Sequence, residues 1–261
     1  MIRVLVTGAA GKMGREVVKT VTAAEGMSVV AAVDPGCDGL SVDDGSGNQI
    51  VCTGDLAAAI TMHAPNVMVD FTHPDAVEGN LRIALQAGVD CVVGTTGLSE
   101  GQLRALASDA PEGTCLFVAP NFAIGAVLMM RFAQEAARFM PHVEIIELHH
   151  DKKADAPSGT ALRTASLIAA GRCDVPEVPG KETEITPGAR GAFVDDIAIH
   201  SVRLPGLVAH QEILFGGQGQ TLSLRHDSID RTSFMPGVVL AVSGVGGLSG
   251  LVIGLETLMG E

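Results

Sequence analysis

Residues 2–14 read IRVLVTGAAGKMG, and they decide the fold of the first part of the chain. The first six are a mostly β-branched and aliphatic run, which predicts a strand buried on both faces. A glycine turn follows at once and leads into a helical pattern up to about residue 24. A second strand, predicted for 29–33, ends at Asp34, which lies 20 residues after Gly14. Strand, glycine turn, helix, strand and acid in this order predict a Rossmann-like dinucleotide-binding domain.

The glycine turn is expected to hold the pyrophosphate of the dinucleotide. Its glycines allow a tight turn, a close approach of phosphate to the backbone amides, and close packing of helix on strand. The spacing is GxxGxxG instead of the commoner GxGxxG, and an ordinary turn is the alternative. The position between a strand and a helix favours phosphate binding. The expected cofactor contacts in this turn are Gly8, Ala9, Ala10, Gly11, Lys12 and Met13.

Asp34 is expected to accept hydrogen bonds from the adenine ribose hydroxyls. A carboxylate at this position repels a 2′-phosphate, and Pro35 stands where a site for NADP often has an arginine. NADH is therefore the expected preferred cofactor. Lys12 can offset the repulsion, so NADPH remains an alternative.

The remaining pattern of this domain alternates strands and helices. Residues 36–54 are rich in Gly, Asp and Ser and predict a surface loop without an assigned function. His73, at the end of a predicted strand, can approach the cofactor, although a capping or surface role is favoured. Strands are predicted at 67–71, 91–93 and 115–118, and helices at 55–62, at 74–87 and after a cap near Ser99.

Composition excludes several classes of function. The 261 residues carry a net charge of −13 without a basic patch, which argues against nucleic-acid binding. No apolar run reaches the roughly 20 residues that span a bilayer, so a cytoplasmic protein is expected. The five cysteines are odd in number and lack CxxC spacing, so neither a disulfide framework nor a metal site is predicted. Cys91 and Cys115 fall in apolar strand patterns and are expected in the core.

A second polar stretch, EIIELHHDKKADAPSGTA at 144–161, combines a strand with a loop and the start of a helix. His149 and Lys153 come directly after the predicted strand, and a helix N-terminus follows at 158–160. An imidazole, an ammonium and backbone amides together suit a carboxylate ligand. The alternative is a solvated surface loop.

The run from His149 to Leu162 closely resembles the signature loop of the 4-hydroxy-tetrahydrodipicolinate reductase family of lysine and diaminopimelate biosynthesis. The sequences GTTG at 94–97 and APNF at 119–122 also resemble cofactor contacts of that family. One departure is the pair Asp151-Lys152, which replaces a more basic pair and puts only local charge in doubt. The cofactor contacts that the resemblance implies are Gly94, Thr95, Thr96, Ala119, Pro120, Asn121 and Phe122.

The resemblance implies reduction of a small cyclic dicarboxylate by NADH or NADPH. Hydride comes from the nicotinamide, and His149 donates the proton. Lys153 binds the substrate and can assist protonation. The other residues expected to bind substrate are His150, Ser158, Gly159 and Thr160. In this family the substrate loses its hydroxyl as water before it is reduced, and the subunits typically form a homotetramer.

The chain is expected to form two domains. Residues 1–122, completed by 231–261, are the dinucleotide-binding domain, and 123–230 form an α+β domain for substrate binding and oligomerisation. A mixed sheet is expected there, from strands at 143–148, 197–202, 209–215 and 221–225, with helices at 124–140 and 160–170 and an irregular connector at 171–195. Two closing helices are expected at 235–245 and 248–259.

Two other functions remain open from the residues alone. A semialdehyde dehydrogenase on the same scaffold would need a nucleophilic cysteine beside a base, which no cysteine here has nearby in sequence. A dinucleotide sensor without enzymatic activity would have no use for the clustered histidines and lysines.

Overall fold

The computed structural model describes residues 1–174 and 183–260 and divides the chain into two compact units. The first comprises Met1–Ala123 and Arg231–Glu261, and the second comprises Ile124–Asp230. Each unit has its own sheet and its own hydrophobic core. In these described ranges, no helix is long and apolar enough to cross a membrane.

The first unit is built on an eight-stranded sheet in the order β13-β7-β6-β5-β1-β2-β4-β3. All neighbours pair in parallel except β3 and β4. The strands are β1 (Ile2–Thr7), β2 (Met27–Val33), β3 (Ser41–Asp43), β4 (Gln49–Thr53), β5 (Val67–Asp70), β6 (Asp90–Val93), β7 (Cys115–Val118) and β13 (Gly250–Ile253). This doubly covered parallel sheet confirms the predicted Rossmann-like fold.

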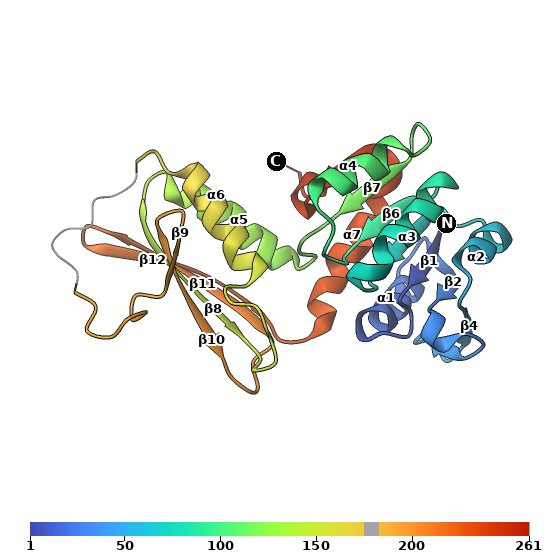
Figure 1. Cartoon of the computed structure of the whole chain (residues 1–261), viewed down its shortest axis with the longest axis horizontal. Coiled ribbons are helices and arrows are strands. Elements are labelled where there is room, and N and C mark those ends of the chain that lie inside the picture. Colours follow the sequence, from blue (N-terminus) through green and yellow to red (C-terminus); the bar gives the residue numbers. More distant parts are fainter. Residues whose placement is uncertain (175–182, 261) are drawn as a thin grey trace. The chain divides into compact units, whose positions relative to one another are not determined.

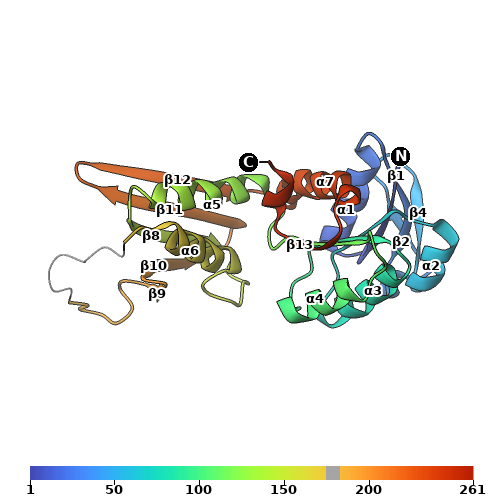
Figure 2. The same cartoon turned by 90° about the horizontal axis from the view of Figure 1, so that it is seen from above.

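Helices cover both faces of this sheet (Figures 1 and 2). Two lie on one face: α1 (Lys12–Ala23) and α7 (Met235–Gly244). Three lie on the other: α2 (Leu56–His63), α3 (Pro74–Gln86) and α4 (Glu100–Ser108). Because both faces are buried, the strands are nearly continuous apolar runs, which is why they could be predicted from sequence.

Glycines let the turn after β1 pack tightly. Gly8 has a φ of +70°, and a Cβ atom there would lie 2.4 Å from the carbonyl oxygen of Phe71. Gly14, in the first turn of α1, is buried, and its Cβ would lie 2.0 Å from the carbonyl oxygen of Gly8. Only glycine fits at either position, so α1 begins directly against the end of β1.

The second unit has a five-stranded mixed sheet in the order β12-β11-β8-β10-β9. Only β10 and β8 pair in parallel. The strands are β8 (His142–His149), β9 (Ala192–Val194), β10 (Ile197–Arg203), β11 (Ala209–Gly217) and β12 (Gln220–Ser228). Two helices that contact each other, α5 (Ile124–Ala137) and α6 (Gly159–Gly171), pack on one face of this sheet (Figure 1). The expected mixed sheet is confirmed.

Three predicted segments are wrong in part. The loop expected at 36–54 contains β3 and β4, and β4 extends the main sheet beside β2. The helix expected at 248–259 is instead β13 followed by the 3-10 turn η4 (Leu255–Leu258), because Gly250 and Gly254 adopt positive φ angles that interrupt a helix. The connector expected at 171–195 ends in β9, and its residues 175–182 lie outside the described residues.

The remaining short 3-10 turns are η1 (Pro35–Cys37), η2 (Arg231–Phe234) and η3 (Val245–Gly247). The turn η2 leads into α7, so the chain re-enters the first unit at Arg231.

Replacing Gly14 by alanine should destabilise the first unit, because the added methyl group would collide with the backbone of Gly8. Overpacking of this kind costs about 1–3 kcal/mol, seen as a lower urea midpoint of unfolding. The matched control is Gly79→Ala in α3, where a Cβ meets nothing within 4 Å. That change should stabilise the protein by about 0.5–1 kcal/mol. Equal midpoints for the two variants would contradict the close packing.

Candidate active site

A cavity of about 340 Å³ lies at the carboxyl ends of the strands in the first unit. Gly8, Gly11 and Asp34 line it, and Gly11 is the N-cap residue of α1 without a side-chain cap. The first amides of α1 therefore remain available to an anion, and Lys12 lies exposed at the first helical position. This arrangement fits the pyrophosphate of a dinucleotide.

Asp34 is held in place by backbone amides. Its Oδ2 accepts a hydrogen bond from the Ala10 amide at 3.1 Å, and its Oδ1 accepts one from the Gly36 amide at 3.0 Å. Each carboxylate oxygen can accept a second hydrogen bond, so the fixed group can still bind ribose hydroxyls. Ala9 is buried and contributes only backbone to this turn.

The fully buried carboxylate of Asp70 organises the neighbouring strand ends. It accepts hydrogen bonds from the hydroxyls of Thr7, Thr72 and Thr95 at 2.7, 2.7 and 2.6 Å. The Asn80 amide on α3 donates another at 2.9 Å. One carboxylate thus ties β1, β5, α3 and the turn after β6 together. Sequence analysis missed it because Asp70 is the last residue of an otherwise apolar strand.

A second cavity, of about 240 Å³, is lined by residues of the GTTG turn together with Met13 and Phe71. Both cavities share Phe71 and Thr72, so they continue along one edge of the sheet. The hydroxyl of Thr95 donates to Asp70 and accepts from the Thr72 amide, so it supports the turn. Thr96 is exposed at the cavity. A Cβ on Gly94 would meet the Phe71 ring at 2.1 Å, so this glycine is needed for packing.

The APNF turn follows β7 in the same unit. Phe122 is 2% exposed, and its ring centroid lies 5.6 Å from that of Phe71, so Phe122 packs in the core. Asn121 accepts a hydrogen bond from the Ala123 amide at 2.8 Å. Ala119 is buried and Pro120 is exposed. His73 caps α3 with its Nδ1 and is 75% exposed, while it also lines the first cavity.

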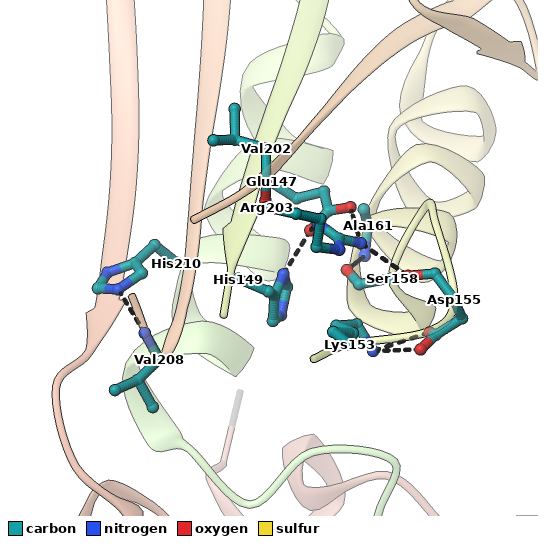
Figure 3. Close-up of polar contacts among 10 residues, drawn as sticks. All are labelled: Glu147, His149, Lys153, Asp155, Ser158, Ala161, Val202, Arg203, Val208 and His210. Atoms are coloured by element: carbon teal, nitrogen blue, oxygen red, sulfur yellow. Dashed lines mark hydrogen bonds and ion pairs between the residues drawn. The ribbon is translucent and has the colours of Figure 1, made fainter. Parts of the chain in front are cut away.

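In the second unit, His149 is the last residue of β8 and is 13% exposed. Its Nδ1 contacts Oε2 of Glu147, which is fully buried (Figure 3). Arg203 holds the same carboxylate with two hydrogen bonds, of 2.9 and 2.7 Å. Sequence analysis identified His149 but missed Glu147 and Arg203.

Burial and charge act on these groups in opposite directions. Burial would raise the pKa of Glu147, but hydrogen bonds from Arg203, Ser201 and His149 outweigh it and lower that pKa. Burial lowers the pKa of His149; Glu147 opposes this shift, while Lys153 and Arg203 add to it. The carboxylate is therefore ionised, and the imidazole gives up a proton more readily than an exposed histidine.

Lys153 lies in the loop after β8, on the same side of the strand end as His149 (Figure 3). Its ammonium binds both carboxylate oxygens of Asp155, at 2.7 and 2.8 Å. Asp155 is 61% exposed, whereas Lys153 is 21% exposed. The structure thus brings two of the predicted groups, His149 and Lys153, to one place. His150 and Lys152 are exposed.

The helix α6 begins beside this loop. Ser158 is 3% exposed, and its hydroxyl accepts a hydrogen bond from the Ala161 amide at 3.2 Å, which confirms the predicted N-cap. Gly159 is exposed, and a Cβ there would meet nothing within 4 Å, so a ligand can reach its backbone. Thr160 is half-buried in the first turn. The positive end of α6 faces the loop that carries Lys153.

Other candidate chemistries find no support in the described ranges. Burial raises the pKa of the thiols of Cys52 and Cys115 to about 11 and about 12, and that of Cys91 well above its usual value, so these three cysteines are not thiolates. Among residues 1–174 and 183–260, no group of three or more His, Cys, Asp and Glu side chains is arranged to hold a metal ion.

Comparison with known protein families matches both parts of the chain. Residues 2–122 match the model of the dihydrodipicolinate reductase N-terminus, and residues 125–259 match that of the dihydrodipicolinate reductase C-terminus.

Proteins of similar sequence carry a consistent name. A 4-hydroxy-tetrahydrodipicolinate reductase of Desulfitobacterium hafniense is 51% identical over 265 residues, covering 99% of this chain and 98% of its own. The protein of that name from Moorella thermoacetica is 51% identical over 266 residues, with the same coverage.

A solved structure has a similar fold over nearly its whole length. The dipicolinate-bound dihydrodipicolinate reductase from Paenisporosarcina sp. TG-14 has a TM-score of 0.85 and 46% identity, covering 98% of this chain and 99% of its own. An amine dehydrogenase from Mycobacterium smegmatis, at 17% identity and a TM-score of 0.65, shares the fold alone. Because both halves of the chain match and the relatives are aligned end to end, this chain belongs to the dihydrodipicolinate reductase family.

Proposed function

We propose that this chain reduces 4-hydroxy-tetrahydrodipicolinate to tetrahydrodipicolinate with NAD(P)H, a step of lysine and diaminopimelate biosynthesis. The observation that carries the proposal is the grouping of His149 and Lys153 at the end of β8, beside the N-terminus of α6. A cyclic dicarboxylate needs cations and amide donors for its carboxylates and a proton for the carbon skeleton. This grouping offers both.

A reduced nicotinamide cofactor, when bound, supplies the hydride. The residues that would hold it are those of the glycine turn, Asp34 and the turn around Thr95, which line the two cavities, and those of the turn around Asn121, which the family resemblance implies. The cradle formed at Gly8 and the open N-terminus of α1 suit the pyrophosphate. Asp34 favours NADH because its fixed carboxylate would repel a 2′-phosphate. NADPH is the second candidate, because the exposed ammonium of Lys12 would offset that repulsion.

His149 donates the proton. After water leaves the hydroxylated substrate, hydride addition to the unsaturated carbon leaves an electron pair that must take up one proton. The donor is the imidazolium form of the half-buried ring, and because burial lowers the pKa of His149, this form is a stronger acid toward the substrate than that of an exposed histidine. After donation the neutral ring is reprotonated from solvent.

Lys153 and the first turn of α6 bind the two carboxylates of the substrate. The ammonium exchanges its present partner Asp155 for a substrate carboxylate, and the Gly159 amide with the helix dipole receives the other. Ser158 stabilises this first turn of α6 by capping it, and Thr160 belongs to the same turn. His150 lies exposed at the start of the loop.

A semialdehyde dehydrogenase needs a nucleophilic thiolate beside a base. Cys52, Cys91 and Cys115 are buried thiols with raised pKa values, Cys37 is half-buried in η1, and Cys173 is exposed and contacts the backbone oxygen of Arg138. We also propose a homotetramer and a cytoplasmic location. The face of the second sheet opposite α5 and α6 presents Ile146, Leu148 and Leu214, and pairing this face between copies would bury them.

The reaction is tested by following NADH oxidation at 340 nm with freshly prepared 4-hydroxy-tetrahydrodipicolinate. Turnover should depend on this substrate, and kcat/KM should be higher with NADH than with NADPH. The rival activity is assayed separately, with aspartate semialdehyde, phosphate and NAD(P)+, as a rise at 340 nm, and a reaction without substrate serves as the control. Turnover with the semialdehyde alone would replace the proposed function by its rival, and cofactor binding without any turnover would indicate a sensor.

His149→Gln should lower kcat by about 10²- to 10⁴-fold, the usual contribution of a general acid. The affinity for NADH, measured by the enhancement of its fluorescence on binding, should stay the same, because the residues that would hold the cofactor lie in the first unit. A similar loss of NADH affinity would show that His149 does not act as the acid.

Lys153→Met should raise KM for the substrate by about 10- to 100-fold, since a charge-assisted hydrogen bond contributes about 1.5–3 kcal/mol. The neighbouring Lys152→Met is the matched control, because Lys152 is exposed and its replacement removes the same positive charge from the same loop. Steady-state kinetics at fixed saturating NADH measure both. If the two variants raised KM equally, Lys153 would attract the substrate only through the overall positive charge of the loop and not through a specific contact.

A further inference from the structure

We infer that Glu147 and Arg203 are positioning residues for the reaction: their buried ion pair turns Nε2 of His149 outward and keeps the imidazolium form available. The inference rests on the proposed function, because proton donation by His149 is its premise. It assigns roles to two residues that sequence analysis did not single out.

The sheet register places these side chains on one face. Glu147 and His149 are alternate residues of β8, so they point to the same side of the sheet as the core residues Val143 and Ile145. On the parallel neighbour β10, Arg203 lies directly opposite His149. The row of β8 that faces α5 and α6 is therefore apolar at one end and ionic at the other.

The contact at Nδ1 decides which ring nitrogen can act. In neutral imidazole one nitrogen carries the hydrogen and the other accepts. Since Nδ1 of His149 faces a carboxylate oxygen of Glu147, the hydrogen of the neutral ring resides on Nδ1. A further proton must then bind at Nε2, which points away from Glu147. The proton donated to substrate is the one on Nε2.

The charges around His149 explain why Glu147 must stay ionised. Two cations, Lys153 and Arg203, lower the pKa of the ring in addition to burial, and Glu147 alone among the nearby charges raises it. Two further carboxylates lie in the loop: that of Asp155 is engaged with Lys153, and that of Asp151 is exposed. On β11, Ala209 lies opposite His149, and His210 lies opposite Leu148, so His210 points to the other face and pairs with Asp227.

Arg203 is what keeps Glu147 ionised at full burial. A carboxyl group withdrawn from water tends to become neutral unless cations and donors satisfy it. The guanidinium supplies two hydrogen bonds to Glu147 and a third, of 2.7 Å, to the backbone oxygen of Asp155. Arg203 thereby also connects the carboxylate to the loop that carries Lys153.

Two variants, one for each partner of the ion pair, test the inference. With substrate and NADH saturating, kcat should fall as pH rises and His149 loses its proton. Glu147→Gln removes the anion and should move this fall to lower pH by about one to three units, so that kcat recovers in mild acid. Arg203→Gln removes the cation that keeps Glu147 ionised and should also move the fall to lower pH, because a neutral Glu147 no longer raises the pKa of His149. Loss of kcat by one constant factor at every pH in both variants would overturn the inference.

Glu144→Gln is the matched control. Glu144 is on the same strand but the opposite face, where it binds Arg190 and His200. Its variant should keep the wild-type pH profile and NADH affinity. If Glu147→Gln does not fold, the double variant Glu147→Gln/Arg203→Gln, which leaves no unpaired charge, should fold and show lower kcat with unchanged NADH affinity. A double variant with wild-type kcat would overturn the inference.

Nitrogen NMR of the His149 ring gives a measurement independent of turnover. The ring signals, assigned by their absence in His149→Gln, should show the hydrogen on Nδ1 in the neutral form. An Nε2–H form in the wild-type protein would overturn the inference. If the NMR result holds but the wild-type protein does not turn over 4-hydroxy-tetrahydrodipicolinate, the proposed function fails and the positioning of His149 by Glu147 stands.

Discussion

A carboxylate removed from water must be surrounded by donors, and each unit of this protein has a fully buried carboxylate at the end of a strand. Asp70 in the first unit and Glu147 in the second are both fully buried. Neither carboxylate is proposed to contact a ligand. Asp70 fixes the hydroxyls of Thr72 and Thr95 in the turns after β5 and β6, and Glu147 fixes a ring nitrogen of His149. The hydrogen bonds that offset the cost of burying each carboxylate therefore also orient the side chains that donate them. The stability of the strand end is in this way linked to the positions of the side chains around it.

The elements that sequence analysis predicted well are those governed by local rules. The first strand, the glycine turn and α1 follow one another without tertiary help, and the cap at Ser158 needs only three residues. His149 and Lys153 were also recognisable, because polar residues directly after a strand break its pattern. The prediction failed where long-range pairing decides. The short strand β4 gains its stability from β2, and β13 from β7. A short window of sequence around β4 or β13 does not contain the strand with which it pairs.

The same limit explains the residues that sequence analysis missed. Arg203 reaches Glu147 only because β10 pairs with β8 in a particular register, across 56 positions of sequence. In the sequence alone, Glu147 is a polar residue in an alternating strand and would be assigned to the solvent face. The alternation is ambiguous here, since Ile145 and Ile146 are adjacent and either could face the core. The core turns out to take Val143 and Ile145, and that choice carries Glu147 inward.

The contact between Lys153 and Asp155 bears on how the site accepts a diacid. Asp155 is largely exposed, and an exposed ion pair contributes at most about 1 kcal/mol. Such a pair keeps the ammonium extended and hydrogen-bonded, yet a substrate carboxylate can replace Asp155 at little cost. The pair of Glu147 with Arg203 is different, since both partners are largely buried and neither can be exchanged for a ligand without exposing a charge to an apolar surrounding. In the proposed mechanism the site thus combines one fixed ion pair, which would hold the acid, with one exchangeable pair, which would receive the substrate.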